Sequence, residues 1–260
     1  MTALASAGTG SPGTRGLSRT VLRVHRTALT VWTVVILAAV GHLVWLTEVT
    51  ADSVHARIAA CSPTQDSCTF SSALGEYTGP LGMTSTFAYY SFWAVAAWAG
   101  GALIGRELES GTAHLAWTQG VSPARWLATK LAVPALALVL GDTLFVVVFR
   151  WAWAAHRDLM GDDWTFADVF AARGPTLVAY SLCALAVGAL TALLLRRALA
   201  ALAISVAVMI VLNQYLEIQR EDRWTRPRFW PMTLMESGIL LTLAALATTA
   251  AFVALRRRTV

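Results

Sequence analysis

Six apolar runs, each close to twenty residues long, place the strongest constraint on what this chain can fold into. They cover roughly 28–46, 85–105, 131–149, 174–195, 198–216 and 237–255. A helix that crosses the ~30 Å hydrocarbon core of a bilayer needs about 20 such residues. The polar segments between the runs are too short to form a separate globular domain. We therefore predict an all-α integral membrane protein with six transmembrane helices.

The composition agrees with a single membrane domain. Of the 260 residues, 57% are hydrophobic and 13% are charged, whereas an ordinary soluble domain carries about 25% charged residues. Residues 1–14 are small, polar and Gly-rich, which predicts a disordered tail. The remaining residues, 15–260, are predicted to form one transmembrane domain.

The distribution of basic residues predicts how the chain is oriented. With the N-terminus in the cytoplasm, the inner segments hold twelve of the twenty basic residues but only two acids, Glu107 and Glu109. Cytoplasmic loops of membrane proteins carry such an excess of Lys and Arg. Both termini are thus expected to be cytoplasmic. The net charge of +5 then reflects topology and not a nucleic-acid partner, because no basic groove interleaved with aromatic residues is present.

Four arginines precede the first apolar run at helical spacing. Arg15, Arg19, Arg23 and Arg26 fall on one helical face, and apolar residues fall on the opposite face. This pattern predicts an amphipathic helix that lies on the anionic lipid of the inner leaflet. A positively charged flank without a particular helix geometry is the alternative.

The three cysteines fall into two groups. Cys61 and Cys68 lie in the first predicted outer loop, where a disulfide could persist outside the cytoplasm. The spacing leaves a bridge and two free thiols both open. Cys183 lies within the fourth apolar run and is predicted to be a small apolar filler. No CxxC pair or Cys/His cluster with metal-ligand spacing occurs, so no metal site is expected.

Catalytic motifs are absent from the sequence. There is no GxxxxGK[S/T] phosphate-binding loop and no HExxH pair. His42 is the one histidine within an apolar run, and no Ser, Cys or acid accompanies it at a spacing that indicates a dyad. A hydrogen-bonded packing role is the prediction for His42. The chain is not expected to be an enzyme, and no cofactor is expected in it.

Asp142 lies beyond the middle of the third apolar run. An ionised Asp near the centre of a membrane helix costs roughly 2.5–3.5 kcal/mol on insertion scales. Two explanations remain open: a hydrogen bond to a neighbouring helix, or a place on a translocation pathway.

Gly101 and Gly105 form a Gly-x-x-x-Gly pair in the second apolar run. Such a pair allows close helix contact in membranes. It predicts a packing face, either within the subunit or at a dimer contact.

The segment between the second and third runs carries a clear set of helix signals. Gly111 is expected to end one helix, and Thr112 to cap a new one. Gly120 can stop that helix after about two turns. Ser122 and Pro123 then predict a restart, with Ser as the cap and Pro at the first helical position. The prediction is a short helix held between two membrane spans.

This segment resembles the permeases of the ATP-binding cassette (ABC) type-2 transporter class. In that family an acidic-Gly-Thr segment after the second span forms a coupling helix, which docks on an ATPase subunit. The matching residues here are Glu107, Glu109, Gly111 and Thr112, with Leu115 and Trp117 on the docking helix and Arg125 and Lys130 as the basic lead into the third span. Ala113 and His114 depart from the bulky aliphatic residue that often follows Gly-Thr, and the usual Pro is displaced to Pro123.

The resemblance implies the membrane subunit of an ABC exporter in a bacterial plasma membrane. It implies an ABC ATPase partner that binds ATP and Mg, and a second permease subunit in a homo- or heterodimer. The alternative is a non-transporting assembly or sensor subunit that binds a cytoplasmic partner through 106–120. The sequence does not indicate the substrate.

Overall fold

The computed structural model describes residues 26–60, 70–160, 166–221 and 229–259. These residues are helical apart from short turns, and no strand occurs among them. Six of the helices are long and apolar enough to cross a membrane, as judged by length and composition. The prediction of six spanning helices is confirmed. Some predictions lie outside the described residues: those for the tail 1–14, for Cys61 and Cys68, and for three of the four surface arginines, Arg15, Arg19 and Arg23. The fourth, Arg26, begins the first helix.

The first two spanning helices are longer than their apolar runs, and each contains a π-helical turn. The first consists of α2 (Arg26–Trp45), η1 (Leu46–Thr50) and α3 (Ala51–Ala60). The second consists of α4 (Phe70–Trp98), η2 (Ala99–Gly105) and α5 (Arg106–Glu109).

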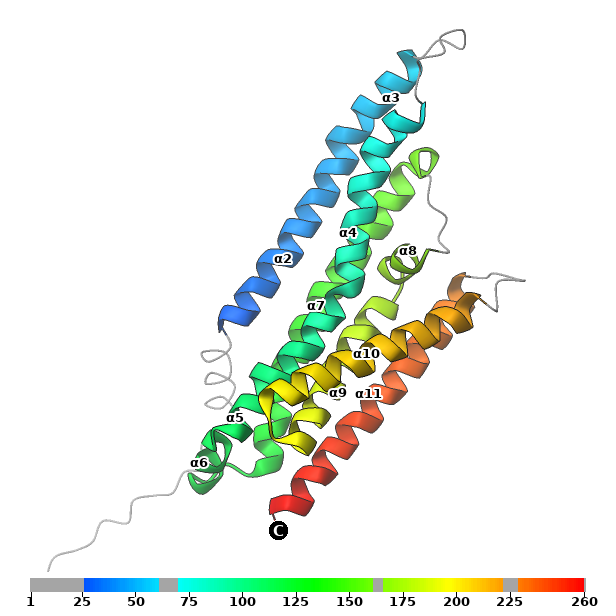
Figure 1. Ribbon diagram of the computed structural model, residues 1–260. Coiled ribbons are helices and arrows are strands. Elements are labelled where there is room, and N and C mark those ends of the chain that lie inside the picture. Colours follow the sequence, from blue (N-terminus) through cyan, green and yellow to red (C-terminus); the bar gives the residue numbers. More distant parts are fainter. Residues whose placement is uncertain (1–25, 61–69, 161–165, 222–228, 260) are drawn as a thin grey trace, which may run out of the picture.

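The other elements follow in chain order from the short helix to the last span. They are α6 (Thr112–Thr118), α7 (Pro123–Ala155), η3 (Arg157–Leu159), α8 (Ala167–Ala172), α9 (Thr176–Leu195), α10 (Ala198–Glu221) and α11 (Phe229–Thr259). Figure 1 shows the long helices as a tilted bundle, with α2 along one edge and α11 along the other.

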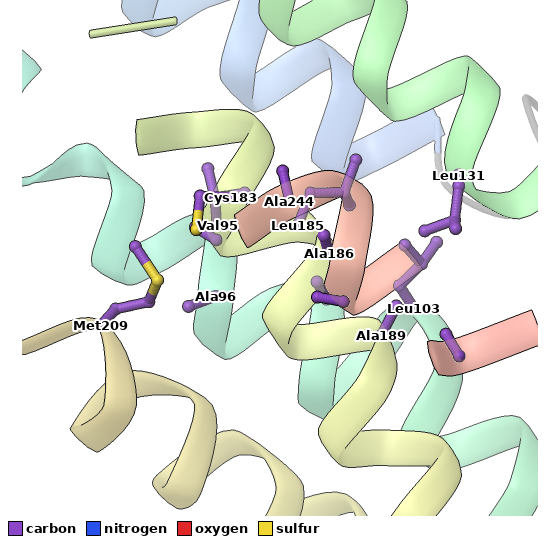
Figure 2. Close-up of a cluster of buried hydrophobic side chains, with 14 of the residues drawn as sticks. Val95, Ala96, Leu103, Leu131, Cys183, Leu185, Ala186, Ala189, Met209 and Ala244 are labelled. Carbon is purple, nitrogen blue, oxygen red and sulfur yellow. The ribbon is translucent and has the colours of Figure 1, made fainter. Parts of the chain in front are cut away.

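Helix α9 is the centre of the bundle. It packs against α4, η2, α7, α8, α10 and α11. Its neighbours come close because its buried face is rich in small residues, including Gly188. Figure 2 shows Cys183, Ala186 and Ala189 of this face. Cys183 is a free, fully buried thiol within this core, so its prediction as a filler is confirmed.

The Gly-x-x-x-Gly pair packs within the subunit. A Cβ atom placed on Gly105 would lie 3.0 Å from Ala198 Cα, and one on Gly101 would lie 3.2 Å from Leu202 Cδ1. Both neighbours belong to α10. The structure therefore selects the intramolecular alternative for this face.

Several chain segments meet at one end of the molecule. The start of α2, the short helix α6, the α9–α10 turn and the end of α11 all lie there (Figure 1). In the α9–α10 turn, Arg196 adopts a left-handed conformation with φ 55°. Arg258 of α11 donates from Nη1 to the carbonyl of Leu193 at 2.6 Å, which satisfies one of the free carbonyls at the end of α9. The structure thus places the beginning of the first span and the end of the last span on the same side.

Candidate functional site

The short helix α6 forms where the sequence predicted it, between two glycines with positive φ. Gly111 has φ 75° and Gly120 has φ 89°, a backbone region that glycine adopts without the Cβ clash of other residues. Ser122 caps α7 by accepting a hydrogen bond from the Arg125 backbone N–H, as predicted. The prediction for Thr112 is wrong, because Gly111 occupies the N-cap position. The Thr112 hydroxyl instead donates to the Glu107 carbonyl at 3.3 Å.

Glu107 fastens the beginning of this segment to α7. Its Oε1 atom accepts a charged hydrogen bond from Lys130 Nζ, and its Oε2 atom accepts one from Trp126 Nε1 at 3.3 Å. The Lys130 side chain is 5% exposed and that of Glu107 is 24% exposed. A carboxylate and an ammonium that are this well shielded from water compensate each other's charge. The predicted basic lead into the third span thus includes the partner of Glu107.

Glu109 fastens the same segment to a third helix. Its Oε2 atom accepts a hydrogen bond from the Ala198 backbone N–H at 3.0 Å. Ala198 begins α10, where free N–H groups and the helix dipole favour a negative charge. Both acids of the segment therefore form contacts within the chain.

The exposed surface of α6 is smaller than the sequence indicated. Leu115 is 60% exposed, as expected for a contact residue. Trp117 is half-buried and packs edge-to-face against Trp126, with 5.8 Å between ring centroids. It also contacts the His114 ring at 4.6 Å. The Trp117 ring therefore joins α6 to α7, while Leu115 and His114 are exposed.

A cavity of about 260 Å³ lies among α2, α4, α7 and α9. It is mostly apolar, but its lining includes His42, Thr84 and Asp142. The Thr84 hydroxyl donates its proton to the Pro80 carbonyl at 2.8 Å, so His42 Nδ1 is the donor in the 2.9 Å bond between His42 and Thr84. The predicted hydrogen-bonded role of His42 is confirmed.

The structure brings Asp142 to the wall of this cavity. The residue is 1% exposed. The Ser181 hydroxyl of α9 lies within reach of its carboxylate. Among the described residues, however, neither Asp142 Oδ2 nor the Ser181 hydroxyl has a hydrogen-bond partner. Sequence reasoning identified Asp142 as unusual, but it had no means of finding the cavity, which is built from four helices.

A buried polar network lies farther along the core and was missed by the sequence analysis. Glu236 is 4% exposed and pairs with Arg220, with 3.4 Å between Arg220 Nε and Glu236 Oε2. The Tyr180 hydroxyl donates to Glu236 Oε1 at 3.0 Å, and the Arg220 guanidinium lies over the Phe170 ring. The network joins α8, α9, α10 and α11. Its members are too far apart in the sequence for a spacing rule to detect.

At the opposite end of the molecule from α6, the structure gathers three potential metal ligands. His55, His156 and Asp158 place one ligand atom each within 4.8 Å of one another. His55 Nε2 lies 2.6 Å from Asp158 Oδ2, and this hydrogen bond holds the pKa of Asp158 below its ordinary value. His55 is about a hundred residues from the other two, which explains why the sequence showed no such cluster.

The chain as a whole is similar to one known family of membrane proteins. The family described as "ABC-2 membrane transporter related" matches residues 33–220. The chain belongs to this family. No curated protein and no solved structure matches it.

The family match covers five of the six spanning helices and the whole of the α5–α6 segment. The protein is thus an ABC-2 type, multi-pass membrane protein. Members of the family are generally non-enzymatic membrane subunits that work with an ATPase partner.

Proposed function

We propose that this ABC-2 protein is the permease subunit of an exporter. In this proposal ATP hydrolysis by a separate ATPase drives substrate translocation through the membrane domain. The observation that carries the proposal is α6, a short helix with an exposed Leu115 that is fastened to three of the long helices.

A coupling element needs both a contact surface and a firm connection to the moving parts. Leu115 supplies an apolar contact at the end of the molecule. The Glu107–Lys130 pair connects the base of α6 to α7, and Glu109 connects it to α10. A force applied to α6 would therefore change the relative positions of long helices, as happens when rigid elements shift at an interface.

The nucleotide site belongs to the partner in this proposal. ATP and Mg would bind on the ATPase subunit, and a second permease subunit, identical or different, would complete the transporter. The end of the molecule that carries α6 would face the cytoplasm, consistent with the excess of basic residues there. The cavity beside Asp142 would lie on the substrate pathway.

Binding to the ATPase tests the proposal. The full chain is co-expressed with the ATPase encoded beside it, and the complex is captured through the permease. Because burial of each CH2 group is worth about 0.8 kcal/mol and Leu115→Ala removes the side chain beyond Cβ, this substitution should weaken binding roughly fivefold or more. Leu246→Ala is the matched control, since Leu246 is 62% exposed on α11 and distant from α6 in the chain.

Coupling is measured with the assembled complex in lipid nanodiscs. Gly111→Pro should uncouple ATP hydrolysis from export, because proline cannot adopt the φ of 75° at this position. The proposal is wrong if Leu115→Ala and Gly111→Pro both bind the ATPase and support hydrolysis and export like the parent. Tight ATPase binding without any export would instead favour an assembly or sensor subunit.

A further inference from the structure

The Asp142 cavity has the chemistry of a binding site for a positively charged amphipathic molecule. We propose that it binds a lipophilic amine, with the ammonium group at Asp142 and the apolar body along α2. This inference rests on the proposed function, for which it names the substrate class.

The carboxylate is the first element of the argument. Asp142 is 1% exposed, and its Oδ2 atom has no hydrogen-bond partner among the described residues. A buried charged group without a partner is unfavourable, and a bound cation removes that cost. No described Lys, Arg or His side chain forms a salt bridge with Asp142. The bound molecule can therefore supply the positive charge.

Two other polar groups of the cavity, His42 and Ser91, already donate their protons within the chain. His42 donates from Nδ1 to Thr84. The Ser91 hydroxyl donates to the Ala88 carbonyl at 2.7 Å and so has no proton to offer. A primary ammonium group carries three N–H donors and no acceptor. It complements the Asp142 carboxylate and the Ser91 oxygen, while the Trp32 indole N–H is a donor on the same wall.

Trp32 adds an aromatic surface to the same wall. A Cβ atom placed on Gly141 would lie 2.8 Å from Trp32 Nε1, so the glycine is what allows the indole to lie against α7 beside Asp142. Trp32 lines the cavity together with Asp142. Indole is the side chain with the strongest attraction for a cation over its face.

Neighbouring cavities along α2 offer space for the apolar body. A second cavity of about 320 Å³ shares Trp32, Val35 and Ser91 with the first. A third shares Val31 and Trp98 with the second and reaches Glu107 at the α6 end of the molecule. The three cavities follow one another along α2, which contacts α7 more extensively than α4. The wall of the second cavity is apolar except for Ser91 and the indole nitrogens.

Equilibrium binding to the purified full-length protein in detergent tests the proposal without an ATPase. The two probes are tritiated 1-naphthylmethylamine and its uncharged analogue, 1-naphthalenemethanol. The parent should bind the amine at least tenfold more tightly than the alcohol. Asp142→Asn should remove this preference by weakening amine binding at least tenfold while leaving alcohol binding unchanged.

Leu140→Ala is the matched control on α7, since Leu140 is 61% exposed and faces away from the cavity; it should bind like the parent. Equal affinity of the parent for both probes, or an amine preference that survives Asp142→Asn, overturns the proposal. If Asp142→Asn does not yield monodisperse protein, Ala39→Phe decides instead, because it fills the cavity and leaves the carboxylate in place. Amine binding unchanged by Ala39→Phe also overturns the proposal. None of these binding measurements depends on the ATPase. A failure of the amine-site proposal can therefore be told apart from a failure of the proposed exporter function.

Discussion

Lys130 is a charged side chain in a shielded position, and its partner explains why it is tolerated there. It is 5% exposed and pairs with Glu107 across 23 residues of sequence. Removing one member of a buried ion pair costs about 3–5 kcal/mol, because the remaining charge is left uncompensated. At the residue scale, this pair is the contact that most directly joins the α6 segment to the membrane helices.

We expect Glu107→Ala to lower the free energy of unfolding by about 3 kcal/mol, toward the lower end of that range because Glu107 is partly exposed. Thermal unfolding of the detergent-solubilised protein measures the change. The double variant Glu107→Ala/Lys130→Met removes both charges and should recover most of the loss. A single variant as stable as the parent would show that the pair does not hold the segment.

The Asp158–His55 contact predicts a pH dependence with a defined sign. Because hydrogen bonding to His55 lowers the pKa of Asp158 in the folded protein from its ordinary 3.8, its stabilisation is fully present above that value. It is lost as the pH falls through the lower folded pKa. Asp158→Asn should therefore lower the unfolding temperature at a pH well above 3.8, and this effect should disappear at a pH below the lowered folded pKa.

The exposed Asp52 on α3 gives a control for this pH series. Asp52→Asn should leave the unfolding temperature close to that of the parent at both pH values. An Asp158→Asn effect that is as large at low pH as near neutrality would mean that the contact does not depend on the carboxylate charge.

At the scale of elements, α9 crosses η2 at close range. A Cβ atom placed on Gly188 would lie 2.6 Å from Ala99 Cβ and 2.9 Å from the Ala96 carbonyl oxygen. Forcing an extra methyl group into a packed core typically costs about 1–3 kcal/mol. Gly188→Ala should therefore reduce the free energy of unfolding by that amount, as measured by thermal or denaturant unfolding in detergent.

Gly238 on α11 provides the matched control, because a Cβ atom placed on it would have no neighbouring atom within 4 Å. Gly238→Ala should be neutral or stabilising by up to about 1 kcal/mol, since alanine favours the helix. Equal effects of the two substitutions would mean that the close crossing is not what limits stability.

The boundaries of elements were predictable where a local signal exists. Gly111, Gly120 and Ser122 mark the ends of α6 and the start of α7 through backbone conformation and capping, which depend on neighbouring residues alone. The π-helical turns η1 and η2 carry no such signal. The η1 turn begins where the first apolar run ends, whereas η2 lies inside the second run. The first span extends beyond its run through α3, and the second through the beginning of α4 and through α5.

At the scale of the whole molecule, hydropathy alone was enough to predict six spans, because each crossing requires about twenty apolar residues. The candidate sites were predictable only in part. Asp142 stood out by its charge, but the His42–Thr84 bond and the Arg220–Glu236 pair depend on which helix faces lie together. That arrangement is set by packing between distant segments, for which single-residue spacing offers no rule.

The orientation of the bundle is open to a direct test. With Cys61 and Cys68 replaced by Ser, a cysteine introduced at Gln119 should react with a membrane-impermeant maleimide only after the cells are permeabilised, because the α6 end is expected to be cytoplasmic. A cysteine introduced at Asp158, at the other end of the bundle, should react in intact cells. The reverse pattern would invert the topology.

The two acids of α5 give the bundle an unusual mechanical property. The base of α6 continues from α4 along the chain, contacts α7 through Glu107 and contacts α10 through Glu109. In the proposed mechanism, a displacement of α6 by a few ångströms would act on α4, α7 and α10 and change their positions relative to the other helices, unless one of these polar contacts breaks. Which of these outcomes occurs would determine how rigidly a movement of α6 is transmitted to the long helices. Neutralising Glu107 or Glu109 alone would weaken that connection.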